Sequence, residues 1–189
     1  MKVRRQIFSA IAYLILGIFV CAVAYPTLAQ RVLGSSSLQP AKLVNIVDGD
    51  TVDVEMSKCR APWKGNQQKC RVRLACIDTA ERGQSPFFEN AKNRIEQLIP
   101  VGTSVTIRDT GDTTYDRIVA EIFTANRSVN LQMVREGQAV NYCKYLNQNC
   151  SSDRAAYLNA EAAAKKEGLG VWNPKQPWMT MRERDRCTN

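Results

Sequence analysis

The stretch CRVRLACIDTAE, from Cys70 to Glu81, decides the fold because it combines a strand pattern with charged side chains. Over residues 70–77 the side chains alternate, so that one face is apolar and the other carries Arg73. This alternation predicts a strand with one buried face. Asp78 and Glu81 follow directly, so the end of this strand is expected to bring an arginine close to two acids.

The flanking sequence predicts four more strands and three helices. Short β-rich runs predict the strands, over residues 42–47, 51–56, 104–108 and 118–123. Apolar spacing predicts the helices, over residues 85–100, 128–137 and 152–168. Ser85 and Pro86 suit the cap and first position of the first helix, Ser128 suits the cap of the second, and Gly168 suits the end of the third.

A chain of 189 residues suits one ordinary domain. Five short strands with helices inserted and appended predict an α+β fold. The specific expectation is a five-stranded Greek-key barrel of the oligonucleotide-binding (OB-fold) type with three helices.

The N-terminal segment has the layout of an export signal. Lys2, Arg4 and Arg5 precede an uncharged apolar run, and small residues end at Ala29. Residues 1–29 are therefore interpreted as a cleaved signal peptide or an uncleaved membrane anchor, since the apolar run approaches the length of a span. We expect an exported protein, secreted or periplasmic, with a linker at 30–41, one domain at 42–173 and an irregular tail at 174–189.

The amino-acid composition excludes more kinds of active-site chemistry than the net charge of the chain does. There is no histidine, which excludes enzymes that use imidazole as base or metal ligand. Hydrolytic chemistry would then depend on carboxylates, Arg, Lys, Tyr, Cys or a metal ion held by oxygen. Removing residues 1–29 takes away three of the eight net positive charges and leaves +5, which by itself is weak support for a nucleic-acid partner.

Four acids lie at two strand ends. Asp48 and Asp50 occupy the turn before residue 51, and Asp78 and Glu81 follow the alternating strand. Oxygen ligands without histidine suit a hard cation, Ca²⁺ or Mg²⁺. Ordinary explanations stay open at this point. The Asp-Gly-Asp triplet is also typical of an ordinary turn. Arg73 would also be explained as a solvated side chain on a strand face, and Arg117 as the partner of Asp116 in a surface ion pair.

Five segments in this order resemble the staphylococcal nuclease (thermonuclease) family. They are VDGDTV at 47–52, VRLACIDTAE at 72–81, TYDR at 114–117, VNLQMVREG at 129–137, and the Ala-rich stretch from Ala160 to Trp172. The resemblance covers most of the chain after the N-terminal segment. It implies a monomeric, Ca²⁺-dependent phosphodiesterase that cuts DNA and RNA and leaves 3′-phosphate ends.

The resemblance also implies residue roles. The calcium ligands would be the carboxylates of Asp50 and Asp78 and the backbone carbonyl of Thr79. Glu81 would be the acid that activates water, and Arg73 and Arg117 would bind the phosphate. Asp48 would be a supporting acid, and Tyr115, Tyr142 and Tyr145 would contact the nucleotide.

Three departures from the family pattern affect the site. Ala80 replaces a proline in the loop that positions Glu81, and Asp116 replaces a glycine before Arg117. Tyr145 aligns with one member of the family's tyrosine pair, whereas Cys143 falls on the other and Tyr142 lies beside it. The departures bear on rate and base preference, and none removes a catalytic carboxylate or arginine.

Six cysteines follow the N-terminal segment, which allows 15 pairings. Cys59 and Cys70 flank one long connection and are predicted to pair. Cys143 and Cys150 bracket a six-residue loop and are the second predicted pair. Cys76 and Cys187 follow by elimination.

Two functional classes compete. The first is an exported nuclease that attacks both DNA and RNA, and the second is a non-catalytic oligonucleotide-binding module of the same descent. The joint presence of the acids and arginines favours catalysis. Association with a membrane is expected only if the N-terminal segment stays uncleaved.

Overall fold

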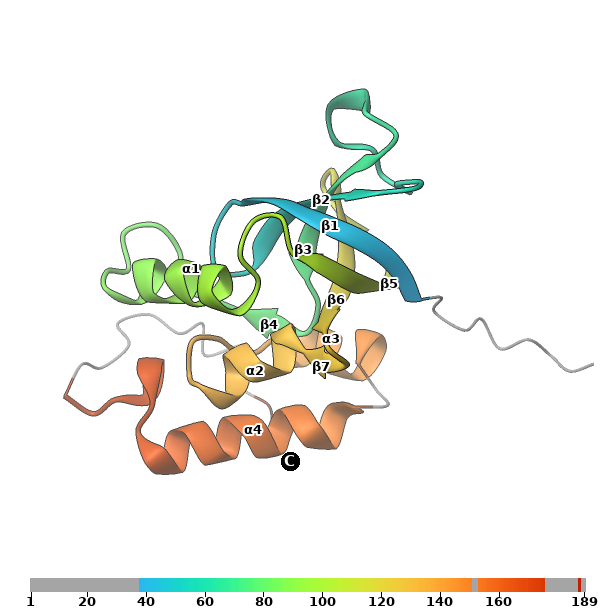
Figure 1. Cartoon of the computed structure of the whole chain (residues 1–189). Coiled ribbons are helices and arrows are strands. Elements are labelled where there is room, and N and C mark those ends of the chain that lie inside the picture. The colour runs from blue at the N-terminus through green and yellow to red at the C-terminus, as the bar shows by residue number, and fades with distance from the viewer. Residues whose placement is uncertain (1–37, 151–152, 176–186, 188–189) are drawn as a thin grey trace, which may run out of the picture. The chain divides into compact units, whose positions relative to one another are not determined.

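Five strands close into a barrel in this computed structural model, which describes residues 38–150, 153–175 and 187 (Figure 1). They are β1 (Leu38–Ile46), β2 (Thr51–Met56), β3 (Lys69–Leu74), β5 (Ser104–Thr114) and β6 (Arg117–Thr124). Neighbours pair antiparallel in the order β3-β2-β1-β5-β6, and a parallel β3–β6 pairing closes the barrel. The predicted α+β barrel of five strands is confirmed.

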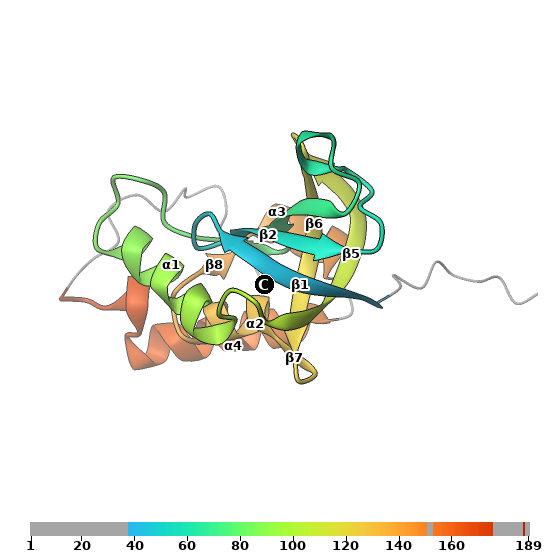
Figure 2. The same ribbon diagram turned by 45° about the horizontal axis from the view of Figure 1, so that its top comes forward.

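Short elements extend this barrel. β4 (Ile77–Asp78) pairs with β8 (Val140–Asn141), and β7 (Arg127–Ser128) pairs with the end of β6. The helices are α1 (Phe87–Leu98), α2 (Val129–Arg135), α3 (Cys143–Asn149) and α4 (Arg154–Glu167), and 3-10 turns lie at η1 (Trp63–Gly65) and η3 (Gly170–Trp172). Figures 1 and 2 show α2 between the barrel and α4.

The three predicted helices are present as α1, α2 and α4, and α3 is a fourth that was not predicted. Its sequence, CKYLNQN, has no apolar stripe, and Leu146 is its only buried residue. A helix of seven residues is too short to be stable by itself. It forms here between two disulfide-bonded cysteines, and that long-range constraint has no local sequence signal.

Two strand boundaries also differ from the prediction. Residues 38–41, which were assigned to a linker, belong to β1. Pro40 precedes Ala41, the first residue of β1 that pairs with β2, so its missing N–H costs no hydrogen bond to β2. β5 continues to Thr114 through a register shift between Asp109 and Thr113. The second half of β5 is polar, so it lacks the alternation of apolar and polar residues by which a strand is predicted.

Helix ends match the prediction in two of three cases. The Ser128 hydroxyl accepts a hydrogen bond from the amide of Leu131 at the start of α2. Gly168 ends α4 in the left-handed conformation, with φ of 63°. The predicted cap of α1 was wrong, because Pro86 itself is the cap residue and makes no side-chain capping bond. Ser152, the expected start of the last helix, lies outside the described residues.

Helix α4 attaches to the barrel through a buried polar cluster. The Tyr157 hydroxyl donates to the carboxylate of Glu121 on β6 at 2.8 Å, and Ser128 and Arg108 bond to the same carboxylate. Burial, followed by the charge of Glu121, raises the pKa of Tyr157 well above its ordinary value. The tyrosine therefore stays a neutral donor and fixes α4 against β6.

The three disulfides confirm one predicted pair and correct two. Cys59 pairs with Cys70 as predicted, whereas Cys76 pairs with Cys150 and Cys143 with Cys187. The expected Cys143–Cys150 pair is wrong because α3 separates these residues. Seven helical residues span about 10 Å, beyond the roughly 7 Å limit between the Cα atoms of a disulfide. The expected Cys76–Cys187 pair is therefore wrong as well.

The terminal predictions are tested only in part. Residues 1–29, the expected signal or anchor, lie outside the described residues. In the expected tail at 174–189, residues 174 and 175 form a turn and Cys187 is described. Within the described parts of the chain, no helix is both long enough and apolar enough to cross a membrane.

Asp53, on the outward face of β2, provides a test of electrostatic stabilisation. It is almost fully buried and accepts two hydrogen bonds from Arg71 and one from Asn45. Burial alone would raise the pKa of Asp53, but the bonds from Arg71 and Asn45 outweigh burial and lower it.

We therefore expect the stabilisation from Asp53 to be complete above about pH 4 and lost as the pH falls through the lowered pKa. Asp53→Asn should unfold more easily at pH 7 and lose less stability between pH 4 and pH 2 than the unaltered protein. Urea unfolding followed by circular dichroism measures both. Glu55→Gln, an exposed change on the same strand, is the control. Parallel acid curves for Asp53→Asn and the unaltered protein would contradict the assignment.

Candidate nuclease active site

A cleft of about 600 Å³ opens between the barrel and α3. Its walls come from the β1–β2 turn, the end of β3, the β5–β6 turn and α3. Nine of the ten functional residues expected from the sequence line it, namely Asp48, Asp50, Arg73, Asp78, Glu81, Tyr115, Arg117, Tyr142 and Tyr145. The tenth, Thr79, is buried and is bonded to Asp50.

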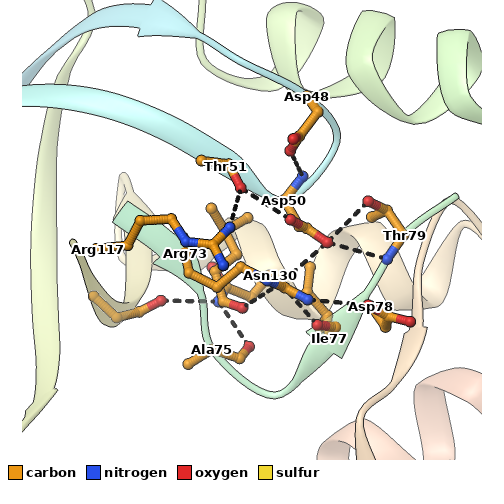
Figure 3. Close-up of polar contacts among 12 residues, drawn as sticks. Asp48, Asp50, Thr51, Arg73, Ala75, Ile77, Asp78, Thr79, Arg117 and Asn130 are labelled. Carbon is orange, nitrogen blue, oxygen red and sulfur yellow. Dashed lines mark hydrogen bonds and ion pairs between the residues drawn. The ribbon is translucent and has the colours of Figure 1, made fainter. Parts of the chain in front are cut away.

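The β1–β2 turn places two acids at this cleft (Figure 3). The carboxylate of Asp48 accepts a hydrogen bond from the amide of Asp50 at 3.1 Å, which closes the turn. Gly49 between them lies so close to α1 that an added Cβ would come within 2.6 Å of the Cβ of Ala91. Burial, followed by the charge of Asp50, raises the pKa of Asp48.

Asp50 is fixed by neighbours on both of its oxygens. Oδ2 accepts from the amide and the hydroxyl of Thr79, at 3.2 and 3.0 Å, and Oδ1 accepts from the hydroxyl of Thr51 at 3.1 Å. Only 6% of Asp50 is exposed. These bonds set the orientation of the carboxylate, and they bring the backbone that carries Asp78 and Thr79 next to the β1–β2 turn.

Arg73 joins the two acids that were expected to bind metal. Its guanidinium lies 3.1 Å from Asp50 Oδ2 and 3.0 Å from Asp78 Oδ1. It also donates to the backbone carbonyls of Leu74 and Ile77, both at 3.0 Å. The strand-face arginine is therefore not simply solvated. The two carboxylates converge on one positively charged group.

Arg117 enters the cleft from the start of β6. Its Nη1 donates to the Thr51 hydroxyl at 3.3 Å, and its guanidinium lies 5.8 Å from the ring centroid of Tyr115. Within the described residues Arg117 forms no ion pair, with Asp116 or any other acid. Its positive charge is therefore available to an anion in the cleft.

Glu81 lies at the exposed edge of the cleft, on the loop between β4 and α1. Its amide donates to the side chain of Gln84, which shapes the loop. Ala80, in place of the family's proline, is buried in a small apolar cluster with Phe87 and Val140. Packing thus anchors the residue that precedes Glu81, although the proline is missing.

Three tyrosines border the open side of the cleft. Tyr142 and Tyr145 form an edge-to-face pair with ring centroids 4.8 Å apart. Tyr115, after the end of β5, is 94% exposed. Exposed aromatic faces beside a charged cleft are suited to contact with nucleotide bases.

No group of three or more His, Cys, Asp or Glu side chains in the described residues is arranged to hold a metal ion. The convergent pair Asp50 and Asp78 supplies two carboxylates, so neutral oxygens would have to complete a site. Ca²⁺ accepts carboxylates, backbone carbonyls and water together, and the carbonyl of the adjacent Thr79 is an oxygen of this kind.

Comparison with known proteins identifies the family. The model of the staphylococcal nuclease homologue family matches residues 71–174, which is more than half of the chain. This chain belongs to the staphylococcal nuclease family. It is a phosphodiesterase of the nuclease type, in a family of metal-dependent nucleases. The alternative of a non-catalytic binding module is set aside.

Individual relatives agree with this assignment. An endonuclease of Haemophilus influenzae, itself uncharacterised, is 32% identical over 72% of this chain and 69% of its own length. The micrococcal nuclease of Shigella flexneri is 30% identical over 78% of this chain and 83% of its own length. An endonuclease of Bacillus subtilis is 27% identical over 72% of this chain but only 12% of its own length.

The sequence did not reveal the far end of the cleft of this nuclease. Asp112, Gln148 and Asn149 line it, and Gln148 donates to the carboxylate of Asp112 at 3.1 Å. These two residues are 36 positions apart in the sequence and belong to no charged or apolar pattern. Only the folded chain brings them together.

Asn130 on α2 supports the nuclease site from inside. It is fully buried, its amide nitrogen donates to the carbonyls of Ala75 and Ala120, and its oxygen accepts from the amide of Ile122. Ala75 belongs to the turn that follows Arg73 (Figure 3). Asn130 is a polar residue between Val129 and Met133, which belong to the apolar side of the helix. That position is the sequence feature that could have predicted a buried, hydrogen-bonded asparagine.

We expect Asn130→Ala to destabilise the nuclease by about 2–4 kcal/mol. The carbonyl of Ala75 and the amide of Ile122 lose their side-chain partner, and the carbonyl of Ala120 keeps its bond from the amide of Ala75. Guanidinium unfolding followed by tryptophan fluorescence measures this. Asn93→Ala, at an exposed position of α1, should change stability by no more than about 0.5 kcal/mol. A loss below about 1 kcal/mol for Asn130→Ala would show that water replaces its bonds.

Proposed function

We propose that this protein is an exported, Ca²⁺-dependent nuclease that hydrolyses both DNA and RNA to 3′-phosphate ends. The observation that carries the proposal is the convergence of Asp50 and Asp78 on Arg73, in one cleft with Arg117 and Glu81. The site offers oxygen ligands, two guanidinium groups and one exposed carboxylate. Together these match the demands of phosphodiester hydrolysis.

Calcium suits the donor set better than a transition metal does. The ligands would be the carboxylates of Asp50 and Asp78 and the carbonyl of Thr79, with water completing the shell. When bound, the ion would supply positive charge beside the phosphate. Because Arg73 now contacts both carboxylates, a cation there would compete with Arg73 for these oxygens. The guanidinium would then turn toward substrate phosphate.

The two arginines stabilise the charge that accumulates on the phosphoryl oxygens. A guanidinium can donate to two oxygens at once, which an ammonium group does less well. Arg117 has no acid partner among the described side chains, so its charge is directed at the ligand. Donors of this kind are worth about 10²–10³ in rate when they act on the transition state.

Glu81 removes a proton from the attacking water. It is exposed at the cleft edge, where water has free access. Asp48 supports the site through its bond to the amide of Asp50. The three tyrosines at the open side contact bases or sugars without selecting a base, which suits a nuclease that accepts both DNA and RNA.

We also propose that the protein works outside the cytoplasm as a monomer. Three disulfides in so small a domain favour an oxidising compartment. The apolar N-terminal segment supports the same proposal, as a cleaved signal or as an anchor to the membrane.

The catalytic roles are tested with residues 30–189 purified in the oxidised form, incubated with plasmid DNA and with RNA. We expect degradation in Ca²⁺, none in chelator, and losses of about 10²–10³ in rate for Glu81→Gln and for Arg117→Ala. The matched controls are Glu96→Gln and Arg135→Ala, exposed positions on α1 and α2. Intact substrates under every condition, from protein with native circular dichroism, would refute the proposal.

Metal binding is tested by titration calorimetry without substrate. We expect Ca²⁺ to bind with one-to-one stoichiometry, and Asp50→Asn and Asp78→Asn each to weaken binding by at least about tenfold, because each removes a charged ligand. Asp116→Asn changes an exposed acid near the cleft and should leave the affinity unchanged. Equal affinities in all three variants would place the ion elsewhere.

A further inference from the structure

The connection from β2 to β3 concentrates positive charge. Residues 57–71 contain five basic residues and no acid, namely Lys58, Arg60, Lys64, Lys69 and Arg71. Residues 57–68 are called the β2–β3 loop below. The loop itself carries Lys58, Arg60 and Lys64, and none of the roles assigned to the cleft involves it.

This loop has a fixed conformation. The Cys59–Cys70 disulfide closes it, and the amide of Cys59 donates to the carbonyl of Gln67 at 2.8 Å. The guanidinium of Arg71 lies 3.6 Å from the ring centroid of Trp63, which stacks the loop on the outer face of the barrel. A loop held in this way presents its charges at little cost in entropy.

The β2–β3 loop is attached to the wall of the cleft. Arg60 donates to both carboxylate oxygens of Asp109, at 3.0 and 2.9 Å, and to the carbonyl of Asp112 at 2.6 Å. Asp112 lines the cleft. Both ribbon views show the loop beside the turn that joins β5 to β6 (Figures 1 and 2). The loop therefore lies next to the wall of the nuclease cleft.

Strand β3 connects the loop to the reacting centre. Lys69, Arg71 and Arg73 alternate with buried residues and share the outward face of β3. Four residues of a strand span about 13 Å, so Lys69 lies about that far from Arg73. One strand of DNA rises about 3.4 Å per nucleotide. The loop thus lies within reach of phosphates four or more nucleotides from the one that is cut.

Some of these charges are already neutralised. Arg60 pairs with Asp109 and Arg71 with Asp53. Lys69 is half-buried and lies outside the loop, opposite Glu55 in the β2–β3 register. Lys58 and Lys64 are exposed, and neither forms an ion pair with a described residue. These two lysines are the charges available to a polyanion.

We propose that the β2–β3 loop binds the phosphate backbone of the nucleic-acid strand that continues beyond the catalytic cleft, through Lys58 and Lys64. This inference rests on the proposed nuclease function and adds a second contact region to it. The contact is electrostatic and independent of sequence. It strengthens the binding of long substrates and leaves the chemistry at the scissile phosphate unchanged.

The test compares a 30-base-pair DNA duplex with a dinucleotide as substrates for the double variant Lys58→Ser/Lys64→Ser. We expect KM for the duplex to rise roughly tenfold in 50 mM salt with kcat unchanged. The slope of log(kcat/KM) against log salt should become shallower by about two, one for each lost phosphate contact. Kinetics with the dinucleotide should not change, because it cannot reach the loop.

The matched control is Lys166→Ser/Lys175→Ser, which removes the same charge at two exposed positions at and beyond the end of α4. Helix α4 lies on the opposite side of the barrel from the loop (Figure 1). The control variant should leave the kinetics and the salt slope for the duplex unchanged. An equal effect of both double variants would show a general effect of net charge and would overturn the proposal.

Duplex binding without catalysis separates this proposal from the nuclease function. Fluorescence anisotropy in chelator measures the affinity of the unaltered protein and of the loop variant for labelled duplex, and weaker binding by the variant supports the loop contact even if neither substrate is hydrolysed. Equal affinities would overturn it. A second arm uses phosphatidylglycerol vesicles. If the loop variant loses vesicle binding while duplex binding is unchanged, the loop recognises a membrane surface and the proposal fails.

Discussion

The guanidinium of Arg73 is the group on which the arrangement of the site depends. It contacts Asp50 from the β1–β2 turn and Asp78 from β4, and it donates to the carbonyls that flank the turn between β3 and β4. Two carboxylates held this close together would repel each other without a cation between them. The arginine therefore acts as an internal counterion, and it holds together the two carboxylates that are proposed to bind the metal ion.

The wall opposite this centre depends on covalent bonds. Helix α3 carries Tyr145 and Gln148 into the cleft, but it is too short to be stable alone. Cys143 ties its start to Cys187, and Cys150 ties its end to Cys76, in the turn after β3. Helix α3, which carries Tyr145, is thus fixed to the turn that directly follows the strand carrying Arg73. An oxidised state is a structural requirement for this side of the cleft.

The sequence predicted those features that depend on residues close together in the chain. Alternation along β3 placed Arg73 outward, and the turn signal at Asp48 and Asp50 marked a strand end, because both depend on residues a few positions apart. The cysteine pairing and α3 could not be derived in this way, since each depends on residues that meet only after folding. Asp112 and Gln148 lack a signal for the same reason: their hydrogen bond joins two loosely patterned polar segments across the cleft.

The position of charge matters more than its amount for this nuclease. Of the positive residues near the cleft, Arg73 is balanced by Asp50 and Asp78, and Arg71 is balanced by Asp53. Arg117, the other arginine that lines the cleft, forms no ion pair with an acid in the described residues. A polyanion held only at one arginine would pivot about that contact, so productive alignment requires a second region of positive potential at a distance. The disulfide-closed loop between β2 and β3 lies where such a region is needed, because β3 leads from it directly to Arg73, beside Asp50 and Asp78.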